Sequence, residues 1–470
     1  MPLFKQRQVV QDQPTEAPVV DPAVQPPTAP PDSGTQAVTD QPVQEPVVPA
    51  TAPEPEAVPP IDRPQVEALL AQAVQSQDGD AVTELFNAIM RYAHQLRASD
   101  VHMEPEAEES TVRIRVDGIL HDEFSVPNVL QRQMIAVLKI LTRMRTDEHR
   151  APQDGRYTYA SALGEVDVRA SIIPVTTGEK AVLRLLSSQS HKLNLEQLGF
   201  SAPDLERIKR AIHKPWGMIL TTGPTGAGKS TTIYAILEIL NSREVNIATI
   251  EDPVEFDIVG VNQSQVDVSA KLTFANGLRA LLRQDPDIIG VGEIRDEETA
   301  KIAVNAALTG HKLLSTLHTN SAAATIPRLI DMHVEPFLIS STLICAVAQR
   351  LMRRICDDCK GEKQLTKTEA QPLANANLVE LLFAGGESIT VADAKGCDKC
   401  NNSGYKGRIG IYEVLENSKA IQDLVVKRSD SDTIQAKAIE EGMTTIVQDG
   451  VRKVLSKVTT LDELIRALQE

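Results

Sequence analysis

A glycine-rich segment followed by lysine and serine is the first part of the sequence whose residue types and spacing could do chemistry. Residues 223–232 read GPTGAGKSTT, which fits the pattern G-x-x-x-x-G-K-S. In such a loop, backbone N–H groups point at a polyphosphate, and the start of the next helix adds a favourable dipole. Lys229 could reach the β- and γ-phosphates, and the Ser230 hydroxyl could bind Mg²⁺. We therefore predict a nucleoside triphosphate site, with ATP contacted by Gly223, Pro224, Thr225, Gly226, Ala227, Gly228, Lys229, Ser230 and Thr231.

Three later segments carry side chains that could support hydrolysis, which needs a group that orients water. Glu255 lies in TIEDPVEF, Glu293 in DPDIIGVGEIRD, and His318 in TGHKLLSTLHT. Each follows an apolar run expected to be a strand, and ligands of open α/β sheets bind at the carboxyl ends of strands. One carboxylate could polarise water while another holds Mg²⁺ through water. Alternatively, some of these acids cap helices or pair with arginines, and His311 is either structural or a nucleotide sensor.

Positive charge opposite the γ-phosphate is the other requirement for hydrolysis. Arg156, Arg169 and Arg184 lie on or beside expected strands upstream of the loop. Two of them could act as arginine fingers from a neighbouring subunit. Surface solvation or ion pairs within the same domain is the alternative for each.

Four of the five cysteines form a second constellation with metal-ligand spacing. They are two C-x-x-C pairs separated by 37 residues: Cys356 and Cys359, then Cys397 and Cys400. Four thiolates around one ion give a closed tetrahedral zinc site that leaves no open position for catalysis. The long gap indicates a small subdomain tied to itself, and a redox role is the minor alternative. The fifth cysteine, Cys345 in LICAVAQR, is expected on an apolar helical face in the core.

The elements that must position these groups fall into three parts. Residues 1–63 are low in complexity, and 16 of the 28 prolines lie within residues 1–64, so we expect a disordered tail. That tail is either a solvated linker or a partner-binding segment. Residues 64–190 read as a mixed α+β domain, with a helix over 80–97 and a hairpin at Asp117-Gly118. From residue 191 to 470, short apolar strands alternate with helices, which predicts a parallel sheet.

Charge and hydropathy narrow the class of protein. The chain has 470 residues, a net charge of −16 and 3% aromatic residues, which argues against a nucleic-acid-binding protein. No run approaches the roughly 18 apolar residues of a membrane span, and residues 1–14 do not read as a secretory signal. Paired cysteines without an export signal favour metal binding over disulfides. We expect a cytoplasmic protein.

Taken together, the motifs resemble the secretion ATPase family of type II secretion and type IV pilus assembly. GPTGAGKSTT, TIEDPVEF, LRQDPDIIGVGEIRDEETAKIAVNAALTGH and STLHTNSAAATIPRL carry the resemblance, as do PQDGR and GEKAVLRLL upstream. The cysteine quartet with GYKGRIGIYE points to the assembly or secretion branch. The resemblance covers about residues 85–470, and the proline-rich segment stands where many members have a helical docking domain.

The resemblance implies an α/β fold in which a PAS-like α+β domain (64–190) precedes a RecA-like ATPase domain (191–470) with a zinc-binding subdomain at about 353–413. It implies a homo-hexameric ring that binds ATP between adjacent subunits. Glu255 would be the candidate catalytic carboxylate, Glu293 would lie near Mg²⁺ or water, and His318 would belong to a histidine box. Arg169 and Arg184 would be the arginine fingers.

The function implied is a hexameric cytosolic ATPase that couples hydrolysis to assembly of type IV pilus or type II pseudopilus subunits. Its partner would be an inner-membrane platform protein, with membrane association through partners only and no nucleic acid. A nucleic-acid translocase on the same fold and a non-hydrolysing nucleotide-binding scaffold are the alternatives.

Overall fold

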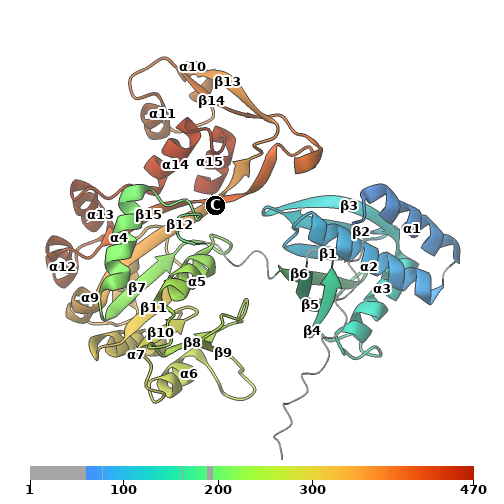
Figure 1. The fold of residues 1–470 in the computed structure, drawn as a ribbon, viewed down its shortest axis with the longest axis horizontal. Coiled ribbons are helices and arrows are strands. Elements are labelled where there is room, and N and C mark those ends of the chain that lie inside the picture. The colour runs from blue at the N-terminus through green and yellow to red at the C-terminus, as the bar shows by residue number, and fades with distance from the viewer. Residues whose placement is uncertain (1–59, 77, 162–163, 188–193, 470) are drawn as a thin grey trace, which may run out of the picture. The chain divides into compact units, whose positions relative to one another are not determined.

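The computed structural model describes residues 60–76, 78–161, 164–187 and 194–469. Two groups of elements, an N-terminal part (60–187) and a C-terminal part (194–469), each have a sheet of their own (Figure 1). Most of the predicted proline-rich tail, up to residue 59, lies outside the described residues. Among the described residues, no helix is both long and apolar enough to cross a bilayer.

The N-terminal part is a six-stranded antiparallel sheet with three helices. Its strands lie in the order β3-β2-β1-β6-β5-β4, and helices α2 and α3 contribute to the core beside its apolar face. The predicted helix over 80–97 is confirmed as α2. The elements are α1 (Arg63–Ser76), α2 (Gly79–Gln95), β1 (Asp100–Pro105), β2 (Glu109–Val116), β3 (Ile119–Pro127), α3 (Asn128–Leu141), β4 (Gln153–Ser161), β5 (Gly164–Val175) and β6 (Gly178–Ser187).

The predicted hairpin at Asp117-Gly118 is also confirmed. Val116 pairs directly with Ile119, so the loop between β2 and β3 has two residues. Asp117 and Gly118 have φ values of 47° and 91°. Positive φ at both central residues is what a type I′ turn needs, and Asp-Gly is one of the pairs that adopt it most readily.

The C-terminal part is built on a seven-stranded sheet in the order β15-β12-β7-β11-β10-β8-β9. The pairs from β12 to β9 are parallel, which confirms the predicted parallel sheet, and β15 pairs with β12 in the antiparallel sense. Strands β7, β10 and β11 are buried along their whole length. The strands are β7 (Gly217–Thr222), β8 (Ile247–Glu251), β9 (Val261–Gln265), β10 (Ile288–Val291), β11 (Lys312–Leu317), β12 (Leu343–Ile355) and β15 (Tyr405–Glu416).

Helices alternate with these strands, and two hydrophobic clusters lie on opposite faces of the sheet. Neighbouring β12 residues divide between them: Ala346 and Ala348 belong to one cluster, and Cys345 and Val347 to the other. The helices are α4 (Ala202–His213), α5 (Lys229–Leu240), α6 (Phe274–Leu281), α7 (Glu297–Leu308), α8 (Thr325–Asp331), α9 (Pro336–Thr342), α12 (Lys419–Val426), α13 (Ser431–Glu440), α14 (Ile446–Leu455) and α15 (Leu461–Gln469).

The secondary structure expected around Cys345 was wrong. Cys345 is buried in the core, as expected, but it lies on strand β12 and not on a helix. The run LICAVA is buried on both faces of the sheet, and periodicity cannot distinguish such a strand from a short buried helix.

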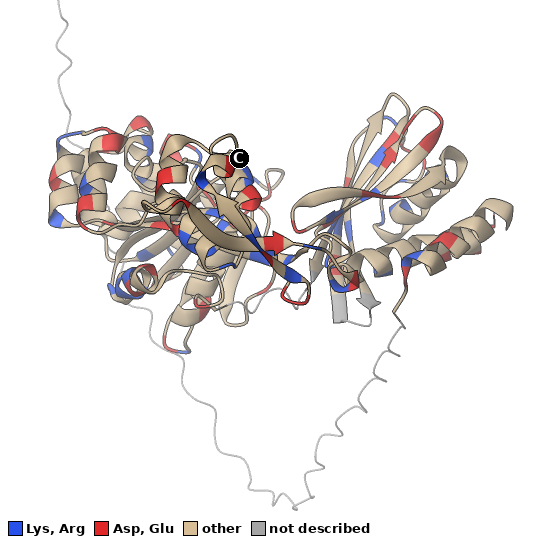
Figure 2. Cartoon of the chain, turned by 90° about the horizontal axis from the view of Figure 1, so that it is seen from above, with Lys and Arg blue, Asp and Glu red and all other residues tan. Residues whose placement is uncertain are grey.

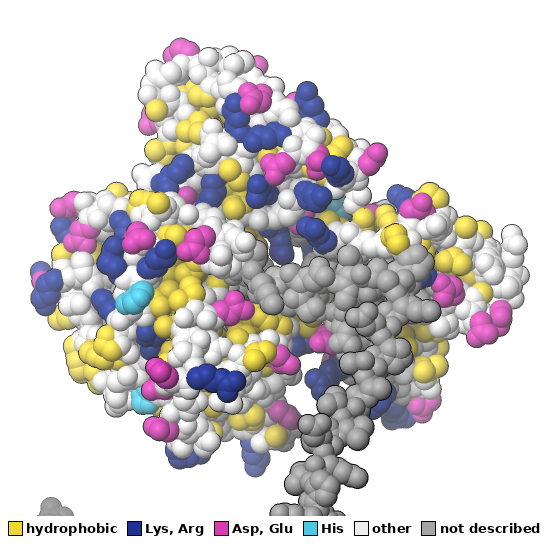
Figure 3. Space-filling view, in the orientation of Figure 1, with side chains coloured by type: hydrophobic (Ala, Val, Ile, Leu, Met, Phe, Trp, Pro, Cys, Tyr) yellow, Lys and Arg dark blue, Asp and Glu magenta, His cyan; other side chains and the backbone are white. Residues whose placement is uncertain are grey.

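A small subdomain fills the gap between the two cysteine pairs. It contains a two-stranded sheet, β13 (Lys360–Thr366) and β14 (Ser388–Ala394), with α10 (Lys367–Ala370) and α11 (Ala376–Phe383). A 3₁₀ turn, η2 (Asp398–Cys400), leads into β15. Figure 3 shows basic and acidic side chains mixed on the visible face of the C-terminal part, including this region.

Strand β15 also holds the segment through which the chain enters the C-terminal part. The carbonyl oxygen of Leu198 accepts hydrogen bonds from Gly410 N (3.2 Å) and from the Tyr412 hydroxyl (3.1 Å). The Phe200 ring stacks on the Tyr412 ring, with centroids 3.6 Å apart. Residues 198–200 are therefore attached to β15, the edge strand of the seven-stranded sheet.

Candidate nucleotide site and cysteine cluster

The glycine-rich loop connects the buried strand β7 to helix α5. Gly228 precedes the first helical residue, Lys229, and has φ +86°. Gly223 has φ +147°, and a Cβ there would overlap the carbonyl oxygen of Gln349. By contrast, a Cβ on Gly226 would meet nothing within 4 Å. The loop therefore passes so close to strand β12 that residue 223 can only be glycine.

The Lys229 ammonium group folds back onto the loop. Its Nζ donates to the carbonyl oxygens of Gly223 (2.9 Å) and Pro224 (3.0 Å). Burial lowers the pKa of Lys229, the nearby charge of Glu293 raises it, and Arg350 lowers it further. A buried ammonium held by carbonyls inside the loop is placed to meet anionic phosphate oxygens. Ser230, the next residue, is exposed.

Glu293 and His318 come together at the same edge of the sheet. Glu293 follows β10, is nearly buried, and forms an ion pair with Arg295. His318 Nε2 lies 3.3 Å from Glu293 Oε2. Both residues follow neighbouring parallel strands, at the same sheet edge as the loop that follows β7, and burial lowers the pKa of Lys229 while the charge of Glu293 raises it. A carboxylate in this position can hold a proton, a water molecule or a cation close to a terminal phosphate.

Two threonines fix the backbone around His318. Thr319 N donates to Thr222 Oγ1 (2.7 Å), and that hydroxyl lies 3.1 Å from the carbonyl oxygen of Leu317. Thr222 is the last residue of β7, so the end of that strand holds both neighbours of His318. His311 lies at the opposite end of β11, where its Nδ1 is 3.0 Å from the carbonyl oxygen of Ala306. The structure therefore separates the two histidines and brings only His318 to the edge that carries the loop.

The two glutamates at and after the end of β8 have different surroundings. Glu251 is buried, and its carboxylate accepts from Thr249 Oγ1 (2.5 Å), Gln263 Nε2 (3.1 Å) and the Tyr234 hydroxyl. These contacts hold Glu251 in place from three sides. Glu255 is half-buried, and its backbone N–H donates to the same Tyr234 hydroxyl (3.3 Å). Its carboxylate has no hydrogen-bond partner among the described residues, so it is available for a ligand.

The predicted arginines share one row of the N-terminal sheet. Arg169 pairs with Arg156 on one side and with Arg184 on the other. Directly opposed residues of antiparallel strands project from the same face, so the three guanidinium groups share a face. Arg184 Nε donates to Asp100 Oδ1 (3.1 Å), and Arg115 approaches the other oxygen (3.4 Å). Arg115 pairs with Asp100 in the same row, so four arginines and one aspartate leave net positive charge there.

The four cysteines of the two C-x-x-C pairs converge in space. Their sulfur atoms all lie within 4.8 Å of one another. The Sγ–Sγ distances are 3.9 Å for Cys356 and Cys397, 3.8 Å for Cys359 and Cys400, and 3.7 Å for Cys397 and Cys400. A tetrahedron with zinc–sulfur bonds of about 2.3 Å has edges of about 3.8 Å. The donor set and its spacing therefore fit a tetrahedral zinc ion.

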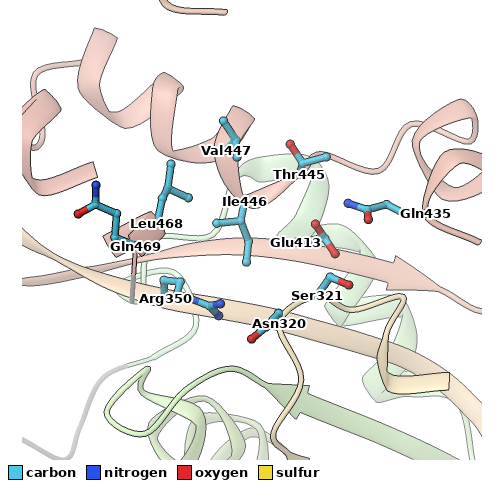
Figure 4. Close-up of a pocket in the computed structure, with 10 residues that line it drawn as sticks. All are labelled: Asn320, Ser321, Arg350, Glu413, Gln435, Thr445, Ile446, Val447, Leu468 and Gln469. Atoms are coloured by element: carbon cyan, nitrogen blue, oxygen red, sulfur yellow. The ribbon is translucent and has the colours of Figure 1, made fainter. Parts of the chain in front are cut away.

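A cavity of about 400 Å³ lies beside the loop's supporting strand (Figure 4). Its lining includes Arg350 of β12 and Glu413 of β15, and Glu413 Oε1 accepts from Ala322 N (2.9 Å). Burial raises the pKa of Glu413. The full lining is Asn320, Ser321, Arg350, Glu413, Gln435, Thr445, Ile446, Val447, Leu468 and Gln469.

The contribution of β12 to the loop could not be seen in the sequence. Gln349 touches the loop through both its side chain and its carbonyl group. The only signal was a polar Gln-Arg pair interrupting the apolar run LICAVAQRLM. Nothing in that pattern says which part of the chain the polar pair meets.

Comparison with known proteins agrees with this architecture. Residues 75–466 match the family model described as "Type II/IV secretion system protein". The chain belongs to this family. It is 44% identical over 407 residues to the type II secretion system ATPase E of Vibrio cholerae, covering 87% of this chain and 78% of the relative. It is 42% identical over 395 residues to the type IV pilus assembly ATPase PilB of Myxococcus xanthus, covering 84% and 69%.

Solved structures show the same fold. The crystal structure of the pilus retraction motor PilT with bound ADP is 27% identical and superposes with a TM-score of 0.54, covering 81% of this chain and 95% of PilT. The ATPase DotB of Legionella pneumophila gives a TM-score of 0.59 at 20% identity, covering 82% and 94%. The chain is thus a secretion or pilus ATPase that hydrolyses ATP. The expected α/β fold class and the resemblance to secretion ATPases are confirmed.

Proposed function

We propose that this chain is a homo-hexameric, cytoplasmic ATPase that drives assembly of pilin-like subunits in a type IV pilus or type II secretion machine. It acts on an inner-membrane platform protein and associates with the membrane only through such partners. Family membership and the names of its relatives support this proposal. The observation that carries it is the pairing of Glu293 with His318 at the sheet edge from which the loop that holds Lys229 leaves strand β7.

The proposed roles at this site follow from charge and exposure. The backbone of residues 223–231 and the Lys229 ammonium hold the phosphates of ATP, and the exposed Ser230 hydroxyl binds Mg²⁺. Bound Mg²⁺ supplies positive charge that neutralises the phosphate oxygens. Glu255 is the proposed catalytic carboxylate because its side chain is available. Glu293 would orient water, either free or bound to magnesium. His318, whose Nε2 lies 3.3 Å from the Glu293 carboxylate, would help to hold that carboxylate in place.

Arg169 and Arg184 are the proposed arginine fingers. We assign them to the γ-phosphate of a neighbouring subunit, and the shared row with Arg156 supports this assignment because it concentrates positive charge. Mixing two inactive variants tests the role. If Arg169 acts between subunits, Lys229→Ala mixed with Arg169→Ala regains activity, because some interfaces then pair a normal loop with a normal arginine. No recovery under conditions that mix subunits would contradict it.

The remaining assignments concern architecture. We propose that residues 64–190 form a PAS-like domain, that residues 191–470 form the RecA-like ATPase domain, and that residues of about 353–413 form a zinc-binding subdomain. Cys356, Cys359, Cys397 and Cys400 hold one structural Zn²⁺. Over the described residues, Figure 2 shows acidic and basic segments interspersed, and we expect no nucleic-acid substrate.

ATP hydrolysis by the purified full-length chain tests the proposal. We expect turnover that Lys229→Ala abolishes, and a mass equal to six chains in the presence of nucleotide. We also expect the platform protein of the same machine to raise the rate. Turnover that survives Lys229→Ala would refute the assigned site, and stimulation by DNA instead of the platform protein would refute the proposed coupling.

A further inference from the structure

The side chain of Gln349 joins strand β12 to the glycine-rich loop. Gln349 is 1% exposed and lies on the strand that neighbours β7. Its Nε2 donates to the carbonyl oxygen of Ala227 (2.7 Å), and its Oε1 accepts from the Thr232 hydroxyl (2.9 Å). One amide group therefore connects the last turn of the loop with the first turn of α5.

The backbone of the same residue limits the loop from the other side. The Gln349 carbonyl oxygen occupies the space next to Gly223, and Nε2 would lie 3.2 Å from a Cβ on Gly228. Gln349 thus contacts the loop near its first glycine and near its last. A phosphate cradle binds more tightly when its N–H groups already point inward, and a residue that contacts both ends of the loop favours that arrangement before nucleotide arrives.

From this geometry we propose that Gln349 is a positioning residue for the phosphate loop and sets its affinity for nucleotide. The inference rests on the proposed assignment of residues 223–231 to phosphate binding. Gln349 touches no reacting atom in this arrangement. Its loss should therefore weaken the binding of ATP and ADP alike and leave the chemical step of bound ATP largely unchanged.

The amide group is well suited to this task because it offers a donor and an acceptor on one planar unit. The Ala227 carbonyl needs a donor, and the Thr232 hydroxyl needs an acceptor. Gln349→Met keeps the length of the side chain but removes both hydrogen bonds. Gln349→Glu keeps the acceptor for Thr232 and turns a second carboxylate oxygen toward the Ala227 carbonyl, where two oxygens repel.

The test is a comparison of nucleotide affinity, KM and kcat in the full-length protein, with a fluorescent ADP analogue as the binding probe. If the loop of the variant forms only when nucleotide binds, binding must replace the free energy of two net hydrogen bonds of ordinary strength, which corresponds to a loss of about thirtyfold in affinity. We expect Gln349→Met to raise the Kd for the analogue and the KM for ATP by about that factor, with kcat within threefold of wild type. Thr232→Val should give a smaller increase, and the double variant should fall short of the product of the two effects.

Asn417→Leu is the matched control. Asn417 is another buried amide, and its Nδ2 donates to the carbonyl oxygens of Ser340 (2.9 Å) and Leu343 (2.8 Å), away from the loop. It should lower the thermal midpoint without changing KM. If Gln349→Met leaves Kd and KM within twofold of wild type, the inference is wrong, and it is equally wrong if its effects match those of Asn417→Leu.

Two further outcomes keep the inference separate from the proposed function. If Gln349→Met does not fold, Thr232→Val decides alone, and an unchanged KM in that variant overturns the inference. Lys229→Ala reports on the underlying assignment: an inactive Lys229→Ala beside an unaffected Gln349→Met refutes only the positioning role. An active Lys229→Ala refutes the assigned phosphate site itself.

Discussion

Replacement of one thiolate in the cysteine cluster gives a prediction whose size can be worked out from the structure. Three of the six Sγ–Sγ distances, 3.7 to 3.9 Å, match the edges of about 3.8 Å of a zinc–thiolate tetrahedron, and all six are within 4.8 Å. Structural zinc contributes about 10 to 16 kcal/mol of apparent binding free energy, so each of four equal ligands accounts for about 2.5 to 4 kcal/mol. We expect Cys400→Ser to lower zinc affinity roughly a hundredfold to a thousandfold.

Cys345→Ser is the matched control, because Cys345 is buried in β12 and belongs to the sheet core instead of the cluster. The assay is metal analysis of the purified chain followed by competition with a chelating dye. We expect one zinc per chain in wild type and in Cys345→Ser, with early release from Cys400→Ser. Limited proteolysis should then cut faster near the two C-x-x-C turns.

The rest of the subdomain should survive metal loss in part. Leu382, Phe383 and Val391 are buried in the same hydrophobic cluster as the main sheet. Those contacts do not depend on the cysteines, so the ATPase sheet should keep its thermal transition. A chain that carries no metal when purified without chelators would refute the reasoning, and so would equal zinc loss from Cys345→Ser.

Three further predictions concern the loop, the acidic site and the C-terminal helix. Glu293→Gln should reduce ATP turnover by about a hundredfold, because it removes the charge beside His318, while ADP binding stays within a few-fold. Gly223→Ala should abolish nucleotide binding because its Cβ would overlap strand β12. Gly226→Ala should lower the binding free energy of nucleotide by only about 1 kcal/mol, because its Cβ meets nothing and only its positive φ is unfavourable. Burial raises the pKa of Glu463, but hydrogen bonds from Arg353 and Arg466 outweigh it and hold the pKa at about 2. This lowered pKa means that the ion pair stabilises the fold above the ordinary glutamate value of about 4.3 and loses that effect as the pH falls toward 2. Glu463→Gln should therefore cost about 3 kcal/mol of unfolding free energy at pH 7 and about 1.4 kcal/mol at pH 3, as measured by denaturant unfolding.

Each of these predictions has an outcome that contradicts it. Turnover of Glu293→Gln at the wild-type rate would remove that carboxylate from the reaction. Equal nucleotide affinity in the two glycine variants would mean that strand β12 does not confine the loop. A cost of Glu463→Gln that is independent of pH would show that packing, and not charge, explains its effect.

The parts of the site that the sequence predicted are those in which chemistry is local. Residues 223–231 lie in one turn between a strand and a helix, so their spacing alone indicates how they fold. The two C-x-x-C pairs could be predicted to meet because each pair is a local turn that supplies two thiolates, and one structural zinc ion needs four. The sequence indicates His318 as a candidate site residue and His311 as either structural or a nucleotide sensor, and the six-residue strand between them carries the two histidines to opposite ends.

Contacts between residues far apart in the chain could not be predicted from the sequence. Gln349 meets Ala227 across 122 residues of chain, and no periodicity encodes which strand lies beside which. The order β12-β7-β11 decides that contact, and it becomes known only with the topology. The strand that carries Cys345 was mistaken for a helix for a related reason, since burial on both faces erases the alternation that would identify it.

The contacts that hold Leu198 and Phe200 on strand β15 lie next to the strand that supports the loop. Tyr412, which makes those contacts, is the direct cross-strand neighbour of Gln349. A continuous row of contacts therefore runs from Leu198 through Tyr412 to Gln349, whose amide group bonds to the loop. A substitution at Tyr412 would therefore disturb two things at once: the attachment of residues 198–200 and the strand that supports the phosphate loop.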